Sequence, residues 1–161
     1  MINKYLKLAI TMLVFSAFAQ AKEQVYSPEL FELWVYKTPN CGCCKKWINH
    51  IEQQGLSANS SDFRSLDFIK SKVGIAANYL SCHTAVMGNG LVFEGHVPAK
   101  FIRQFLAKPM PNAIGLSVPA MPLGSPGMEV NKGFMPYEVL ILFKDGSSQV
   151  FAKVRTYEEQ F

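Results

Sequence analysis

The sequence has little charge and no apolar run long enough to cross a membrane as a helix. Charged residues make up 17% of its 161 residues, and the formal net charge is only +4. The apolar stretch 9–18 is shorter than the ~20 residues that a spanning helix needs. A net charge this close to neutral gives no support for nucleic acid or an anionic membrane as a partner.

The N-terminal residues are typical of a secretory signal peptide. Lys4 and Lys7 precede the apolar run, and Ala19-Gln20-Ala21 fits a small-residue cleavage site. We therefore predict a signal peptide over 1–21 and a periplasmic protein with no stable membrane anchor after cleavage. No cysteine lies near the cleavage site to carry a lipid. Residues 22–161, with a formal charge of +2, are too few for two ordinary domains, and we expect a single one.

The pattern of apolar residues predicts an α/β fold. Strands are expected over 31–36 and weakly over 56–60, and Gly88-Asn89-Gly90 predicts a hairpin joining strands 84–87 and 91–94. Helices are expected over 43–54, over 63–73 with a cap at Ser61-Asp62, and over 98–106. This order is that of a thioredoxin-like sandwich, although other α/β sandwiches share it.

The C-terminal third differs in composition from the rest of the chain. Six of the nine prolines fall in 107–136, together with four glycines and several methionines, which predicts an irregular loop. After it, two apolar segments flank the Lys144–Ser147 turn and predict a β-hairpin over 137–157. The hairpin is expected to extend the sheet.

Four cysteines carry the strongest chemical signal: Cys41, Cys43, Cys44 and Cys82. Three of them lie within four consecutive residues, so they cannot join distant parts of the chain as stabilising disulfides. They fall at a predicted strand-to-helix junction, where the helix N-terminus and the following Lys45 and Lys46 favour the thiolate form. These thiols are therefore predicted to be reactive and to be good ligands for a soft metal ion, above all copper(I).

Two other interpretations of the cysteines stay open. Cys41 and Cys44 have the Cys-x-x-Cys spacing of a thiol–disulfide oxidoreductase, which makes them the candidate catalytic residues, but a third thiol beside them would scramble the exchange. A structural zinc site usually draws on two such pairs, and this sequence has one. Two kinds of enzyme therefore stay open: a copper oxidoreductase that cycles between thiolate–copper and disulfide states, and a thiol oxidoreductase that acts without metal.

Histidine and methionine supply further candidate ligands. His83 follows Cys82 directly; on a strand the two side chains would point to opposite faces, whereas in a loop both could reach one ion. Met121 and Met128 fall in the proline-rich segment and are either copper(I) ligands or a cover for apolar surface. His50 is expected at the surface, and His96, at a helix start, is expected to be structural.

Four motifs in order resemble the periplasmic CopG-type copper-resistance family, a former domain-of-unknown-function family that is distinct from the DNA-binding repressor of the same name. The motifs are Thr38-Pro39-Asn40-Cys41-Gly42-Cys43-Cys44-Lys45-Lys46-Trp47, Ser81-Cys82-His83-Thr84-Ala85, Glu94-Gly95-His96-Val97-Pro98 and Val118-Pro119-Ala120-Met121-Pro122-Leu123-Gly124-Ser125-Pro126-Gly127-Met128-Glu129. The resemblance extends from about Leu33 to Glu129.

This resemblance implies a thioredoxin-like fold and a role in copper handling or copper redox chemistry. It makes the four cysteines copper thiolates, which can form a cluster of more than one copper ion. It also places Met121 and Met128 in a loop over the site. The expected partners are copper ions and other periplasmic copper-handling proteins.

Overall fold

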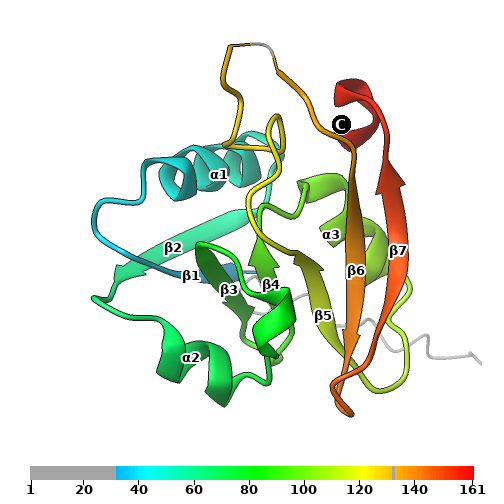
Figure 1. The fold of residues 1–161 in the computed structure, drawn as a ribbon. Coiled ribbons are helices and arrows are strands. Elements are labelled where there is room, and N and C mark those ends of the chain that lie inside the picture. The colour runs from blue at the N-terminus through cyan, green and yellow to red at the C-terminus, as the bar shows by residue number, and fades with distance from the viewer. Residues whose placement is uncertain (1–31, 132) are drawn as a thin grey trace, which may run out of the picture.

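The computed structural model describes residues 32–131 and 133–161, so the predicted signal peptide lies outside the described residues. The described residues form a mixed α/β structure around a seven-stranded sheet, which confirms the predicted α/β class (Figure 1). The strands are β1 Glu32–Lys37, β2 Ser57–Asp62, β3 His83–Met87, β4 Val92–Gly95, β5 Ala113–Val118, β6 Tyr137–Phe143 and β7 Ser148–Val154. The helices are α1 Gly42–Gln53, α2 Asp67–Lys72 and α3 Ala99–Ala107, with 3-10 turns η2 Ala77–Tyr79 and η3 Tyr157–Gln160.

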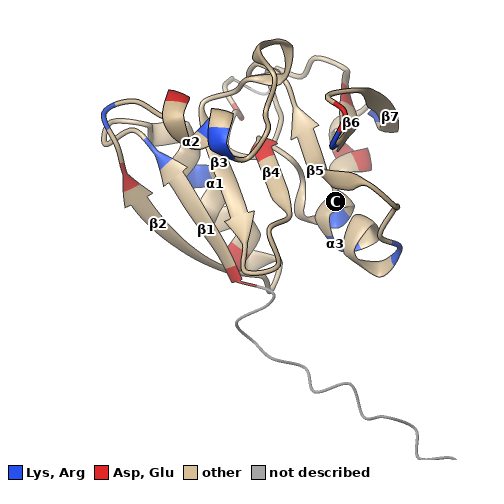
Figure 2. Cartoon of the chain, turned by 90° about the horizontal axis from the view of Figure 1, so that it is seen from below, with Lys and Arg blue, Asp and Glu red and all other residues tan. Residues whose placement is uncertain are grey.

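The sheet has the strand order β2-β1-β3-β4-β5-β6-β7. β1 pairs in parallel with β2 and β4 in parallel with β5, and every other neighbouring pair is antiparallel. Figure 2 shows the strands from β2 to β5 side by side, with acidic and basic residues distributed along the chain rather than gathered in a run of one sign. The helix α1 connects the two parallel strands β1 and β2, as a parallel pair requires.

Helices lie on both faces of the sheet. α1 and α3 pack their apolar stripes, including the fully buried Trp47 and Phe105, against Leu33, Phe93 and Leu116 of the strands. On the opposite face, α2 and η2 cover a smaller apolar cluster (Figure 1). That cluster consists of the buried Ile75, Val92 and Leu142. The site described below lies at one end of the sheet, where α1 and β3 begin.

The predicted helix over 63–73 is shorter in the structure. α2 begins only at Asp67, and Leu66, without a side-chain cap bond, stands at its N-terminus. Ser61 and Asp62 do not cap it, because they continue the β2 ladder opposite Tyr36 and Lys37. The Asp62 carboxylate instead accepts a hydrogen bond from the buried Lys37 ammonium group. Strand pairing and this ion pair therefore override the local capping signal.

The prediction of an irregular loop over 107–136 was wrong for part of its first half. Residues 113–118 form β5, a central strand between β4 and β6. Gly115 permits the close approach to β4, because a Cβ atom there would lie 1.7 Å from the Val92 carbonyl oxygen. The sequence did not predict this strand for two reasons. Prolines flank it on both sides, and its one glycine weakens the β pattern.

The predicted C-terminal hairpin is present and extends the sheet. β6 and β7 pair in antiparallel register from Tyr137 opposite Val154 to Leu142 opposite Ser148. In the described residues, no helix is long and apolar enough to span a membrane.

Candidate metal centre

The cysteine motif connects the end of β1 to the start of α1. Cys41 caps the helix, and its Sγ accepts a hydrogen bond from the Cys44 N–H at 3.3 Å. Cys41 and Cys44 form a disulfide, with their Cα atoms 5.3 Å apart. Cys43 remains a free thiol, and its Sγ lies 3.5 Å from that of Cys41. The helix start therefore presents three sulfur atoms together.

Cys82 brings a fourth sulfur to this position from the residue just before β3. Its Sγ lies 3.6 Å from the Cys44 Sγ and 3.8 Å from the Cys43 Sγ. All four sulfur atoms lie within 4.8 Å of one another. The fold thus unites the four cysteines that the sequence proposed as ligands, across a separation of 38 residues between Cys44 and Cys82.

Two imidazoles extend the cluster through Cys82. His83 Nδ1 lies 3.3 Å and His96 Nε2 lies 3.0 Å from the Cys82 Sγ. Cys82, His83 and His96 form a second group whose donor atoms also lie within 4.8 Å of one another. Cys82 stands just before β3, and the short distance between its Sγ and His83 Nδ1 shows that the two side chains do not point to opposite faces. Cys82 therefore belongs to both donor groups.

His96 was expected to be structural, and the structure places it in the site. Its Nδ1 lies 2.7 Å from the Pro126 carbonyl oxygen, which can only accept a hydrogen bond, so Nδ1 carries the proton. Burial lowers the pKa of His96, which keeps the ring neutral and leaves the Nε2 lone pair directed at Cys82. A backbone carbonyl on the far nitrogen is the usual support of a metal-binding histidine. In the sequence, only its motif Glu94–Pro98 hinted at this role.

His83 is fully buried between two aromatic rings. Its ring centroid lies 4.4 Å from that of Trp47 and 5.0 Å from that of His96. Burial, and then the neighbouring His96 and Lys70, hold the pKa of His83 well below its usual value. Its Nε2 atom has no hydrogen-bond partner among the described residues. A buried, neutral imidazole with an unused nitrogen is suited to metal coordination.

The Cys82 thiol is protonated at neutral pH in the metal-free protein. Burial, followed by the charge and hydrogen bond of Cys43, raises the pKa of Cys82 to about 12. A metal binds the thiolate, so it must displace this proton. Metal binding to Cys82 therefore releases a proton.

The methionine-containing loop packs against the first turns of α1. A Cβ atom on Gly127 would lie 2.6 Å from the Cys43 carbonyl oxygen and 2.8 Å from the Trp47 nitrogen, so only glycine permits this approach. The backbone of Pro126 and Gly127 therefore joins the loop to the site. Met121 is 49% exposed and Met128 is half-buried on the same loop.

His50 lies outside the cluster but is not a plain surface residue. Its half-buried ring accepts a hydrogen bond from the N–H of Ala99 at 3.1 Å, which satisfies a free backbone donor at the start of α3. Burial lowers the pKa of His50, consistent with the neutral form that this acceptor role needs. It therefore ties α1 to α3.

Comparison with known proteins places this site in a family context. Residues 79–128 match a family described as a protein of unknown function, DUF411. No curated protein matches the chain. One solved structure, copper resistance protein CopG in Form 1, is 36% identical, with a TM-score of 0.73, over 80% of this chain and all of that one.

A second structure of copper resistance protein CopG, Form 2, gives the same identity and a TM-score of 0.71. It matches 76% of this chain and 97% of its own. The identity and the near-complete coverage of both relatives exceed what a shared fold alone explains, and the DUF411 segment contains Cys82, His83, His96 and the Met121–Met128 loop. The chain belongs to the CopG-type copper-resistance family.

Proposed function

We propose that the protein binds copper(I) and serves in copper resistance or copper homeostasis. The observation that carries this proposal is the convergence of four cysteine sulfurs and two neutral imidazoles, in two donor groups that share Cys82. The membership of the CopG-type family supports it.

The chemistry of the donor set favours copper(I) over zinc. Thiolates are soft ligands that prefer copper(I), and neutral imidazole also suits copper. Zinc in a structural site takes four ligands in one tetrahedron, whereas this cluster has six donors in two overlapping groups. The shared Cys82 sulfur can bridge two ions, so we propose a site for more than one copper ion.

The proposed ligands are Cys41, Cys43, Cys44, Cys82 and His83, as the sequence suggested, with His96 added by the structure. Met121 and Met128 are proposed as thioether ligands on the loop that packs against α1. The Cys41–Cys44 disulfide withdraws two thiolates, so reduction of this bridge is a condition for the full ligand set.

We further propose a thioredoxin-like architecture and a periplasmic location. The order β2-β1-β3-β4, with a parallel first pair and helices on both faces, supports the first. The signal-peptide pattern of residues 1–21 supports the second.

An anaerobic titration tests the metal proposal directly. The reduced protein without residues 1–21 is titrated with copper(I) against a competing chelator, and in parallel with zinc. We expect more than one copper ion per chain, bound more tightly than zinc, and weaker binding after Cys43→Ser. Copper binding no tighter than zinc binding, or unaffected by Cys43→Ser, would refute the multi-thiolate site.

One observation favours a second candidate function, thiol–disulfide exchange. The Cys41–Cys44 bridge lies within 3.6 Å of the Cys82 thiol and 3.5 Å of the Cys43 thiol. In such a reaction two electrons and two protons pass from a substrate dithiol to the bridge, which becomes two thiols while the substrate becomes a disulfide. Oxidation of one equivalent of a dithiol substrate by the disulfide of the metal-free protein, unchanged by Cys43→Ser, would identify this activity.

A further inference from the structure

A buried ion pair lies on the opposite face of the sheet from the metal centre. Lys70 of α2 and Glu94 of β4 are 6% and 0% exposed, and the lysine ammonium group donates to Glu94 Oε1. Thr84 joins them, because its hydroxyl donates to Glu94 Oε2 at 2.6 Å and accepts from the Lys70 ammonium group at 2.9 Å. The Glu94 carboxylate is thus fixed by partners from two other elements.

The same carboxylate holds the backbone next to Cys82. Glu94 Oε1 accepts the N–H of Ser81 at 2.6 Å. Gly95, the next residue of β4, packs so closely that a Cβ atom on it would lie 2.5 Å from the Ser81 side chain. Ser81 in turn donates from its hydroxyl to the carbonyl of Ala120, the residue before Met121. Ser81 therefore links the buried ion pair both to Cys82 and to the methionine-containing loop.

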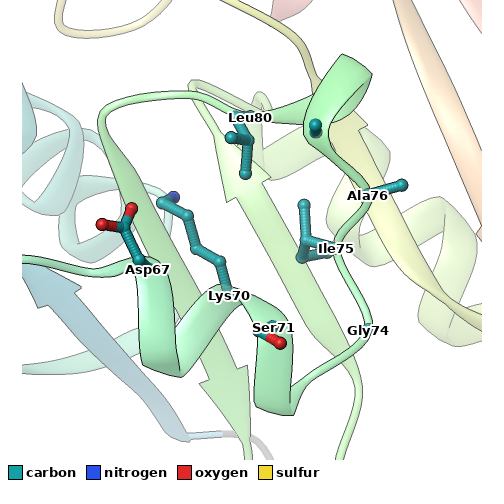
Figure 3. A pocket seen from close by; sticks show the side chains of 8 residues that line it. Asp67, Lys70, Ser71, Gly74, Ile75, Ala76 and Leu80 are labelled. Carbon is teal, nitrogen blue, oxygen red and sulfur yellow. The ribbon is translucent and has the colours of Figure 1, made fainter.

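The segment before Cys82 borders a pocket on the side of α2. A cavity of about 300 Å³ lies between α2 and residues 74–80, with Lys70, Ile75 and Leu80 among its walls. Figure 3 shows the Lys70 side chain running from α2 along this cavity toward the strands behind it. Hydrogen bonds from Ser117 and Ala120 hold Tyr79 and Leu80 from the β5 side. On the α2 side, the hydrogen bond from the Ser81 N–H to Glu94 holds the end of this segment.

Stability alone does not account for charges at this place. A buried ion pair contributes little net stability compared with apolar residues of the same volume, although removal of one partner is costly. What the pair does provide is direction, because a carboxylate held by two side chains aims its oxygen at a single N–H group. Outer groups that orient metal ligands typically influence affinity 10- to 100-fold.

We propose that Lys70 and Glu94 are positioning residues that set Cys82 against Cys43 and Cys44. This inference rests on the proposed copper function for its meaning, but the position of Cys82 can be measured without metal. Glu94 orients the Ser81 N–H, and Lys70 orients Glu94. Together they place the one sulfur atom that both donor groups share.

The test compares Glu94→Gln with the double variant Lys70→Met/Glu94→Gln, which removes the unpaired lysine charge and so protects folding. Two quantities are measured on the reduced protein: copper(I) affinity against a competing chelator, and the rate at which iodoacetamide alkylates Cys82 relative to Cys43. We expect copper(I) affinity to fall about 10- to 100-fold in both variants. We also expect the alkylation of Cys82, but not of Cys43, to change in rate.

Ile141→Ala is the matched control for a general loss of stability. Ile141 is buried in β6, belongs to the apolar core and lies opposite Leu116 of β5. Wild-type copper affinity and wild-type Cys82 alkylation in both Glu94 variants would overturn the proposal, as would an equal loss in Ile141→Ala. Should the wild-type protein bind no copper, the proposed function fails, while the alkylation rates still decide whether Glu94 positions Cys82.

Discussion

The two halves of the sheet bury different kinds of side chain. In the part of the chain that the structure describes, the buried lysines, histidines and glutamate all belong to the half formed by β1–β4 and the segments that adjoin it. They are Lys37, Lys70, His83, Glu94 and His96. The half formed by β5–β7 buries aliphatic side chains such as Leu116, Val139 and Ile141, and its buried polar residues are neutral.

This difference shows where the fold is stabilised and where it is specialised. Apolar burial in the β5–β7 half stabilises the protein by roughly 25 cal/mol for each Å² removed from water, whatever the detailed geometry. Buried polar groups in the β1–β4 half stabilise only when each finds its partner. One of them, His83 Nε2, lacks a partner among the described residues, and the Nδ1 atom of the same ring lies 3.3 Å from the Cys82 Sγ. The unsatisfied group therefore coincides with the site.

A large effect on stability is expected at the contact between the loop and α1. Gly127→Ala adds a Cβ atom 2.6 Å from the Cys43 carbonyl oxygen at a φ of +89°. We expect the free energy of unfolding to fall by about 2–4 kcal/mol, from backbone strain and overpacking together. Chemical denaturation measures it.

The control for this change is Gly146→Ala in the β6–β7 turn. It has a similar φ of +82° but open space around the added atom, so it carries the backbone strain alone. We expect a cost of about 1 kcal/mol. Equal costs for the two substitutions would show that the close approach of the loop is not needed.

Removal of the shared sulfur should separate copper binding from stability. Because Cys82 belongs to both donor groups, Cys82→Ser is expected to weaken copper(I) binding about 100-fold, or about 2.8 kcal/mol. Ile141→Ala should do the reverse: it lowers the free energy of unfolding by about 2–5 kcal/mol and leaves copper affinity in place. Chelator competition measures copper affinity and denaturation measures stability in both variants. A comparable loss of copper affinity in Ile141→Ala would contradict the prediction.

The buried histidines predict that the metal-free protein loses stability in acid. Burial lowers the pKa of His83 and His96, so below the usual value of 6.5 the unfolded chain binds more protons than the folded one. The contribution of the two neutral imidazoles to the free energy of unfolding is fully present above that pH. It is lost as the pH falls, by up to about 1.4 kcal/mol per pH unit for each imidazole. Denaturation between pH 5 and pH 7.5, at about half-unit steps, measures this slope.

Comparison with His83→Gln isolates the share of one ring. The difference between the two slopes removes the contribution of Glu94, whose pKa is raised by burial and which acts in the opposite direction. A wild-type slope no steeper than that of His83→Gln would contradict the neutral assignment of His83.

The smallest effect is expected at a surface ion pair of the β5–β7 half. Lys153 and Glu138 lie 3.1 Å apart, with side chains that are 56% and 45% exposed. Such exposed pairs contribute between about 0 and 1 kcal/mol. Glu138→Gln should therefore alter the denaturation midpoint only slightly, and a larger change would mean that charge matters in this half as well.

Much of the fold could be predicted because local patterns and tertiary structure agree. The Gly88-Asn89-Gly90 turn, the helix after Cys41 and the C-terminal hairpin all follow from signals within one short segment. The errors came where distant partners decide. β5 is held by strands on both sides, and Ser61-Asp62 extend β2 because β1 lies beside them.

The sequence by itself determined the thiol chemistry of this protein, since three cysteines within four residues must lie close together in any fold. It also indicated the family, because the order of the four motifs along the chain does not depend on the fold. Only the tertiary structure decided that Cys82 reaches Cys44 and that His96 directs a neutral nitrogen at it. The same holds for the carboxylate of Glu94, which secures the backbone beside Cys82. These contacts join separate elements, and their geometry is set by how the sheet, α1 and the loop pack together.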